Sequence, residues 1–260
     1  MTHSRTGTGM SCTCQRIGRG IGWQHSYWFM EPSSGAWSWN RFVVPQLRAS
    51  GHTVFATTLT GLGDRTHLAH PGIDLDTHVQ DVVNVLYYED LHDVILVGHS
   101  YGGKVITGVA DRSADRLAHL VYLDAIVPTP LDPVAIPISP EMQVRIDTDG
   151  DGWRIPPDMS DPLTASETWR RQRLSGIPVR AFTQPVRFSN PPPALARTFV
   201  YCTEGKEPAS WITATAARVR DDPDWTYHEL EATRNLYPSA PDATVAILAG
   251  IGDVQDALRP

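Results

Sequence analysis

The sequence of 260 residues predicts an α/β protein in which helices flank a mostly parallel central sheet that carries an inserted cap. Over 27–127 and again over 194–260, short β-branched runs alternate with segments of helix length, which is the pattern of a parallel sheet. The alternation stops over 128–193, a stretch rich in Pro and Asp, which we interpret as the cap. Residues 1–26 are polar, rich in glycine and without periodicity, and we interpret them as an N-terminal extension.

In the first half of the chain, apolar spacing and turn residues predict two strands and two helices. A strand over 27–30 leads into a loop, and a helix then runs from about Trp37 to near Gly51, because glycine commonly ends helices. A second strand over 53–58 precedes the loop 60–67. A helix over 76–88 follows, with Asp76 as its N-cap.

The second half repeats this pattern around the interruption. A strand over 94–97 and a helix over 105–110 enclose a glycine-rich turn, and a strand over 117–123 ends at Asp124. Within the cap, one helix is predicted near 166–174. Strands over 198–202 and 225–230, each followed by a helix (208–219 and 241–258), complete the sheet.

Composition narrows the classes of function. A net charge of −7 argues against a nucleic-acid partner held through phosphates, and no apolar run approaches the length of a membrane span. The N-terminus shows no apolar leader, and three cysteines give no disulfide framework, so we expect a reducing, cytoplasmic environment. We expect a small-molecule substrate, no cofactor, no nucleic acid and no membrane, and we leave a homodimer open.

The turn after strand 94–97 reads Gly98-His99-Ser100-Tyr101-Gly102, which fits G-x-S-x-G. In a strand–turn–helix context this pattern marks a turn so sharp that the serine is strained and pushed into the open. Free N–H groups at the start of the following helix favour developing negative charge there. We therefore predict that Ser100 is a nucleophile, exposed at the floor of a capped pocket; the alternative is a glycine-rich turn with a solvated serine.

Together with this turn, several stretches resemble the α/β-hydrolase fold superfamily, and more narrowly its esterase and hydroxynitrile-lyase-like branch. They are Thr60-Gly-Leu-Gly-Asp-Arg65, Asp76-Thr-His-Val-Gln-Asp-Val-Val-Asn84, Val121-Tyr-Leu-Asp124 and Phe182-Thr-Gln-Pro-Val186. The resemblance implies a Ser–His–acid mechanism without a cofactor. In it the serine attacks a carbonyl, the histidine takes its proton, the acid orients the histidine, and backbone N–H groups hold the oxyanion.

The chain departs from the family at the oxyanion loop. The family usually carries His-Gly at the end of the first of these strands, where this sequence has Glu31 and Pro32. Proline has no N–H to donate, so the Ser33 and Tyr101 N–H groups are the candidate oxyanion donors. A Glu31 carboxylate pointing into the site would repel an oxyanion unless protonated, but it is also a candidate for moving protons.

A larger departure concerns the base. No histidine follows His228, which we interpret as an ordinary strand residue, and the place of the family's catalytic histidine falls near Arg234. Arginine stays protonated and cannot act as a base, but it can hold an anionic substrate or stabilise a charged intermediate. The catalytic triad is therefore predicted to be degraded, with either Asp124 or Glu204 as its acid.

Three further histidines are candidates for the site, although each also fits an ordinary structural role. His99 is expected to pack behind the serine, and we keep it as a substrate-binding candidate alongside Arg234 and Trp153 of the cap. His67 and His70 follow the loop at Thr60 and are alternative sources of a base. No histidine or cysteine cluster has zinc spacing.

The run Asp147-Thr-Asp149-Gly-Asp151-Gly152 fits the start of a calcium loop. Prolines at 156 and 157 oppose the helix that would follow, so we interpret the run as an acidic turn and expect no metal.

Two classes of function follow from these residues. The first is an enzyme that acts through Ser100 on a small, mostly apolar organic ester or carbonyl compound, with weak hydrolytic activity. The second is a non-hydrolytic protein of the same fold, which could be a lyase, a cyclase or a ligand-binding module in specialised metabolism. The intact serine turn favours the first class, whereas the replacements at Glu31-Pro32 and Arg234 favour the second.

Overall fold

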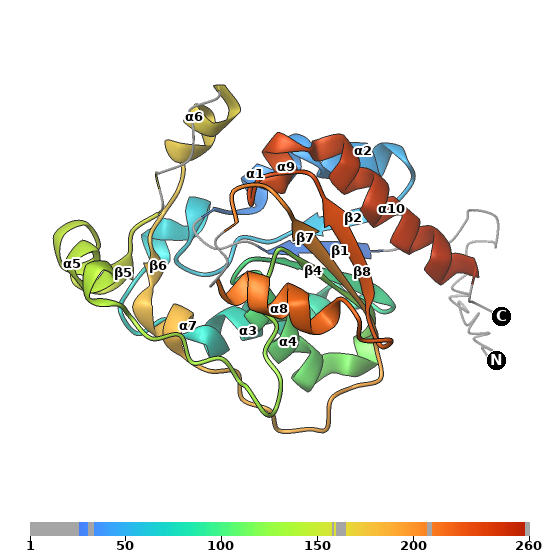
Figure 1. The fold of residues 1–260 in the computed structure, drawn as a ribbon, viewed down its shortest axis with the longest axis horizontal. Coiled ribbons are helices and arrows are strands. Elements are labelled where there is room, and N and C mark those ends of the chain that lie inside the picture. Colours follow the sequence, from blue (N-terminus) through green and yellow to red (C-terminus); the bar gives the residue numbers. More distant parts are fainter. Residues whose placement is uncertain (1–25, 31–33, 158, 160–164, 207–209, 258–260) are drawn as a thin grey trace, which may run out of the picture.

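The computed structural model describes residues 26–30, 34–157, 159, 165–206 and 210–257 (Figure 1). Several sequence-based expectations lie outside these residues: the extension up to residue 25, and the roles assigned to Glu31, Pro32 and Ser33. The first strand begins at Ser26, within the stretch that the sequence assigned to the extension.

Six parallel strands form the central sheet, in the order β2-β1-β3-β4-β7-β8. Their bounds are β1 Ser26–Met30, β2 Thr53–Ala56, β3 Val94–His99, β4 Leu117–Leu123, β7 Ala196–Cys202 and β8 Thr226–Leu230. β3, at the centre, is buried along its whole length, as expected for a strand covered on both faces. The predicted fold class, a parallel sheet flanked by helices, is confirmed.

Helices cover both faces of this sheet (Figure 1). One layer holds α3 Leu75–Tyr88, α4 Gly102–Ser113 and α8 Trp211–Val219; the other holds α1 Ala36–Phe42, α2 Val44–Ala49, α9 Leu236–Ser239 and α10 Pro241–Ala257. The period of two along a strand divides the core between them, because Leu96 and Tyr122 pack with the α4 layer while Val97 and Leu123 pack with the α10 layer. Two 3₁₀ turns, η1 Gly63–Leu68 and η2 Ala114–Arg116, complete the connections.

Between β4 and β7 the chain leaves the sheet and forms short elements of its own. These are α5 Pro140–Asp149, β5 Arg154–Ile155, α6 Ala165–Arg171, β6 Ile177–Pro178 and α7 Val179–Thr183. β5 and β6 pair antiparallel, apart from the central sheet. We refer to residues 128–193 as the insertion; its role as a cap stays a prediction.

The structure corrects three predicted elements. The N-cap of α3 is Asp74, whose side chain accepts the Thr77 N–H at 3.0 Å, and Asp76 lies in the first turn. The helix predicted from Trp37 to Gly51 is two helices that meet at Val43, because Pro45 near the start of α2 has no N–H with which to continue α1.

The third correction is α5, which the sequence analysis missed. Its last turn contains Asp147 and Asp149, so the first part of the calcium-like run is helical rather than a loop. Among the described residues, no group of three or more His, Cys, Asp or Glu side chains could hold a metal ion. No described helix is long and apolar enough to cross a membrane.

Candidate active site

Ser100 lies in the sharp turn that joins β3 to α4. Its φ of 56° is in the left-handed region that non-glycine residues rarely adopt, at a cost of about 1–3 kcal/mol. Two backbone bonds hold the turn, because the Ser100 carbonyl accepts the N–H groups of Gly103 and Ile126 at 3.2 and 3.0 Å. The strained strand-to-helix geometry predicted from G-x-S-x-G is therefore present, with the N-terminus of α4 beside the serine.

The Ser100 hydroxyl contacts the guanidinium group of Arg234. Arg234 Nη2 donates to Ser100 Oγ at 2.5 Å, from the loop that follows β8. Ser100 is only 5% exposed, so the prediction of an exposed serine is wrong: the turn pushes the hydroxyl out of the sheet, where the Arg234 side chain meets it. The residue at the predicted histidine position thus donates a hydrogen bond to the serine.

Asp124 lies behind this pair, at the end of β4. Its carboxylate is fully buried, Oδ1 accepts the Cys202 N–H at 3.1 Å, and Oδ2 lies 3.8 Å from Arg234 Nη1. Lys206 Nζ also contacts Oδ2, at 2.5 Å. One buried carboxylate therefore faces two cations. The Lys206 side chain is mostly buried, whereas Arg234 is 48% exposed, so solvent screens the second interaction more than the first.

Of the two acids that the sequence left open, the structure brings Asp124 to the site. The Glu204 side chain is exposed on the loop after β7. Like Ser100, Asp124 has a positive φ, here 44°, and its N–H donates to the Val200 carbonyl at 2.7 Å. These constraints fix the carboxylate at the carboxyl end of the sheet, beside Arg234.

His99 positions the Arg234 loop. Its Nε2 lies 2.9 Å from the Arg234 carbonyl oxygen, and since a carbonyl can only accept, Nε2 carries the proton. Burial, reinforced by the nearby Arg234 charge, holds the pKa of His99 well below its usual value, so the ring is neutral. His99 packs behind the serine, as expected from the sequence, and donates a hydrogen bond to the backbone of the Arg234 loop.

The insertion also reaches this loop. Arg170 of α6 is 8% exposed, and its guanidinium group donates to Tyr237 Oη at 3.0 Å and to Asn235 Oδ1 at 2.8 Å. Asn235, the residue after Arg234, is therefore hydrogen-bonded to α6. The insertion and the core together fix the backbone on which the guanidinium group is carried.

Tyr101 has its own buried network on the other side of the turn. Its hydroxyl lies 3.0 Å from Nδ1 of His78, whose Nε2 lies 3.0 Å from the Thr60 carbonyl, so Tyr101 donates to Nδ1 and Nε2 donates to the carbonyl. The side chain thus anchors the first turn of α4, and the role predicted for Tyr101 rests on its backbone N–H alone.

Other predicted residues lie apart from this group. The Trp153 ring is half-buried in the turn after α5, with the Arg154 guanidinium carbon 5.0 Å from its centroid. His67 and His70 are exposed, and His228 lies in β8 as an ordinary strand residue. Of the described histidines, His99 directly precedes Ser100, and His78 bonds to Tyr101, which directly follows it.

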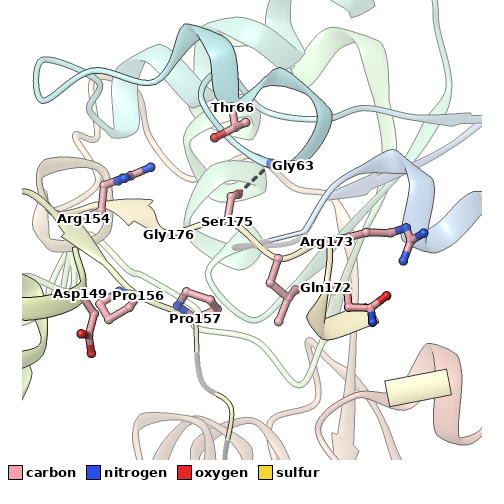
Figure 2. Close-up of a pocket in the computed structure, with 11 residues that line it drawn as sticks. Gly63, Thr66, Asp149, Arg154, Pro156, Pro157, Gln172, Arg173, Ser175 and Gly176 are labelled. Atoms are coloured by element: carbon pink, nitrogen blue, oxygen red, sulfur yellow. Dashed lines mark hydrogen bonds between the residues drawn. The ribbon is translucent and has the colours of Figure 1, made fainter. Parts of the chain in front are cut away.

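A cavity of about 360 Å³ lies at the seam between η1 and the insertion (Figure 2). Gly63 N–H donates to Ser175 Oγ at 2.8 Å across this seam, and the wall carries Thr66, Arg154 and Gln172 among its polar side chains. Neither Ser100 nor Arg234 lines it. The cavity is therefore separate from the serine and is not the capped pocket that was predicted to have Ser100 at its floor.

Sequence reasoning missed Lys206 and His78. Lys206 lies 82 residues from Asp124 in the chain and belongs to no motif, so only the fold reveals the contact. His78 was part of the quoted stretch after Asp76, and its spacing of three residues from Leu75 and four from Val82 places it on the buried face of α3. That spacing was the available signal.

Comparison with known proteins supports the fold described above. A family model described as "Alpha/beta hydrolase family" matches residues 22–247. The carbendazim hydrolyzing esterase of Nocardioides sp. (strain SG-4G) is 53% identical over 94 residues, which is 36% of this chain and 38% of that protein. The pyrethroid hydrolase of Sphingobium wenxiniae is 37% identical over 90 residues, 34% of this chain and 31% of that protein. The matched stretch spans about a third of the length of these curated relatives.

Solved structures share the fold over most of their length. An extracellular alpha/beta-hydrolase from a Paenibacillus species superposes with a TM-score of 0.70 at 18% identity, covering 87% of this chain and 98% of that one. A methylesterase from Arabidopsis gives a TM-score of 0.65 at 24% identity, covering 88% and 99%. From the family model, which spans most of its residues, the chain belongs to the alpha/beta hydrolase family.

Proposed function

We propose that this chain is an enzyme that acts on a small organic ester through Ser100, with hydrolysis slowed because an arginine occupies the place of the base. Esterase and hydrolase names among the relatives support ester chemistry. The observation that carries the slowed hydrolysis is the 2.5 Å hydrogen bond from Arg234 Nη2 to Ser100 Oγ. The choice of an ester as the substrate is supported by the names of these relatives and by the G-x-S-x-G turn.

In this mechanism Arg234 stabilises charge but removes no proton. A guanidinium group donates only, so the Ser100 proton must pass to water, hydroxide or a group such as Glu31 that lies outside the described residues. Once the proton has left, Arg234 and the N-terminus of α4 both stabilise negative charge on Oγ or on a tetrahedral intermediate. Turnover should consequently rise with pH through the neutral range, without the plateau that a catalytic histidine produces.

A second candidate is favoured by the two cations around Asp124. In a lyase, a cyclase or a binding module, Ser100 would act as a hydrogen-bonding group and Arg234 would hold an anionic substrate or intermediate. Under this reading Lys206 keeps Asp124 compensated, so the Arg234 charge stays available for a ligand.

The test restores a histidine at the position of the arginine. We expect the wild-type chain to show no burst of product from a chromogenic ester and only slow labelling of Ser100 by a serine-directed phosphonate. Arg234→His should speed labelling about tenfold or more, because imidazole can take the proton near neutral pH. Arg220→His, at an exposed arginine that pairs with Glu229, is the matched control and should change nothing.

Two outcomes would contradict the proposal. Rapid stoichiometric labelling of wild-type Ser100 with a product burst would reveal a base that the proposal lacks. Equal ester turnover in wild type and Ser100→Ala would exclude the serine as the nucleophile and favour the second candidate.

A further inference from the structure

A second cavity, of about 270 Å³, lies at the far end of α4 from Ser100. Its wall includes Ala110 and Asp111 from the last turns of α4, together with Leu120 and Tyr122 of β4. The lining of this cavity does not include Ser100, Arg234, Asp124 or Lys206. The mechanism proposed above makes no use of this space.

Aromatic and other apolar groups form most of the cavity wall. The rings of Tyr122 and Trp225 lie 5.4 Å apart between centroids at an interplanar angle of 56°, and Phe188 closes another side with several prolines. The Tyr122 hydroxyl is bonded to Thr107 Oγ1 at 2.9 Å, so its polar group is satisfied and its contribution to the wall is apolar. Such walls favour a planar, largely apolar molecule.

The carboxylates at this cavity are committed to other groups. Asp111 accepts the backbone N–H groups of Ser189 and Asn190 at 3.0–3.1 Å. Asp222 Oδ1 accepts the Asp224 N–H at 2.9 Å, and Asp224 lies 3.5 Å from Arg197 Nη2. These bonds turn both Asp111 oxygens toward the insertion backbone and pair Asp224 with Arg197. The Asp111 and Asp222 carboxylates keep their charge, so the attraction of the cavity for an anion comes from Arg218.

Arg218 is the cation of the cavity wall that has no carboxylate partner among the described residues. Its Nη2 donates to the Val127 carbonyl at 2.8 Å. The remaining N–H groups of its planar fork are therefore free to bind an acceptor at the cavity mouth, where a carboxylate would match the fork geometry.

We propose that this cavity binds a planar aryl carboxylate, with its ring packed against the wall that Trp225 and Phe188 form and its carboxylate on Arg218. The site is distinct from Ser100. Its ligand would contact both ends of the insertion, because Pro128 begins that segment and Phe188 lies near its end. Those two connections also run side by side, joined by a bond of 2.9 Å from Val186 N–H to the Pro133 carbonyl (Figure 1).

The cavity also has a direct connection to the serine turn. Ile126 N–H donates to the Ser100 carbonyl at 3.0 Å, and the next residue, Val127, carries the carbonyl that Arg218 holds. Ligand binding at Arg218 therefore acts one residue from a bond that shapes the turn.

The experiment uses 2-naphthoate as the probe and tryptophan fluorescence and calorimetry as readouts, on the full chain. We expect saturable binding at one site per chain and a rise in melting temperature. Arg218→Gln should weaken binding about tenfold or more, because it removes the charged donor. Arg220→Gln is the matched control, an exposed arginine two residues away that pairs with Glu229 and should leave binding unchanged. The uncharged 2-naphthamide and the cationic 2-naphthylmethylamine should both bind more weakly than 2-naphthoate.

Ala110→Leu provides a second, independent variant, because it reduces the cavity from the side of α4 and should also weaken binding. Binding that survives Arg218→Gln unchanged, tighter binding of the cationic analogue, or no saturable binding at millimolar probe would each overturn the proposal. Loss of binding in Arg234→Gln would also overturn it, because the probe would then occupy the Ser100 site.

Discussion

The Ser100 hydroxyl oxygen accepts a hydrogen bond from the permanently charged guanidinium group of Arg234. This charge also determines what Asp124 and Lys206 do at the site. Arg234 brings a positive charge to the end of the sheet, Asp124 lies buried beside it, and Lys206 adds a second cation to the same carboxylate. In a Ser–His–acid site the acid orients a neutral ring, whereas here it compensates two fixed charges. Asp124 should therefore contribute more to the stability of the fold than the acid of a Ser–His–acid site does.

Asp124→Asn should therefore be strongly destabilising. The change removes a fully buried charge and leaves Lys206 and Arg234 without compensation, which predicts a loss of about 3 kcal/mol in the free energy of unfolding. Urea unfolding at neutral pH measures it. Asp151→Asn is the control, because Asp151 pairs with Arg154 at the surface and should cost less than about 0.5 kcal/mol. A loss of similar size in both variants would refute the argument.

His99 predicts a dependence of stability on pH. Its pKa is lowered in the folded protein, by burial first and by Arg234 second, and returns toward 6.5 on unfolding. The unfolded state then binds more protons, so the stabilisation is fully present above pH 6.5 and is lost as the pH falls below that value. His78, whose pKa burial also lowers, acts in the same direction.

His99→Gln keeps a donor for the Arg234 carbonyl but does not titrate. Between about pH 7.5 and 5.5, the fall in unfolding free energy should be smaller than in wild type by about 1 kcal/mol. Chemical unfolding at several pH values provides the measurement. His92→Gln, at an exposed histidine beside Asp90, should leave the wild-type slope intact. An unchanged slope in His99→Gln would mean that folding does not lower the pKa of His99, which would contradict the argument.

At the scale of elements, the turn between β3 and α4 depends on how closely α4 approaches its neighbours. α4 begins directly after the serine turn and is buried at nearly every position. A Cβ on Gly103 would lie 2.1 Å from the carbonyl oxygen of Ile126. Ile126 is also the residue whose N–H donates to the Ser100 carbonyl. The helix therefore packs against the segment after β4 with no room for a side chain.

Gly103→Ala should lower the free energy of unfolding by about 1–3 kcal/mol, because backbone rather than a flexible side chain must move. It should also slow labelling of Ser100, since the same segment shapes the turn. Gly250→Ala is the opposite case: nothing lies within 4 Å of the added Cβ in α10, and alanine favours helix by about 0.5–1 kcal/mol. Thermal unfolding of both variants tests the pair, and a neutral Gly103→Ala would show that α4 can move away from Ile126.

Patterns in the sequence were sufficient for elements whose signal is local. The strand over 117–123 and the serine turn were predicted because β-branched runs and G-x-S-x-G are short-range features. Local chemistry was ambiguous at the start of α3, where Asp74 and Asp76 can both cap and only the fold selects Asp74. Lys206 could not be found at all, because its contact with Asp124 depends on β4 and β7 lying side by side.

At the scale of the whole molecule, the insertion is bonded to both helix layers. On the α4 side, Lys104 Nζ donates to the Phe182 carbonyl at 2.7 Å, and Gln184 binds the start of α3 through the Leu75 N–H at 3.0 Å. On the opposite side, Arg170 reaches Tyr237 of α9. Bonds to both layers indicate that the insertion shares the stability of the core instead of folding as a separate unit.

Because the insertion is bonded to both helix layers, we expect one cooperative unfolding transition. Calorimetry should give a single peak whose calorimetric and van't Hoff enthalpies agree, because loss of the core removes the partners of the insertion. Gln184→Ala removes the acceptor of the Leu75 N–H and the donor to Asp76, and it should shift the whole peak down by about 2–4 °C without splitting it. Gln172→Ala, at an exposed position in the same insertion, should shift it little. Two resolved peaks, or a Gln184→Ala effect confined to the lower one, would show that residues 128–193 unfold independently of the sheet, because the bonds to α3, α4 and α9 would then not couple the two parts.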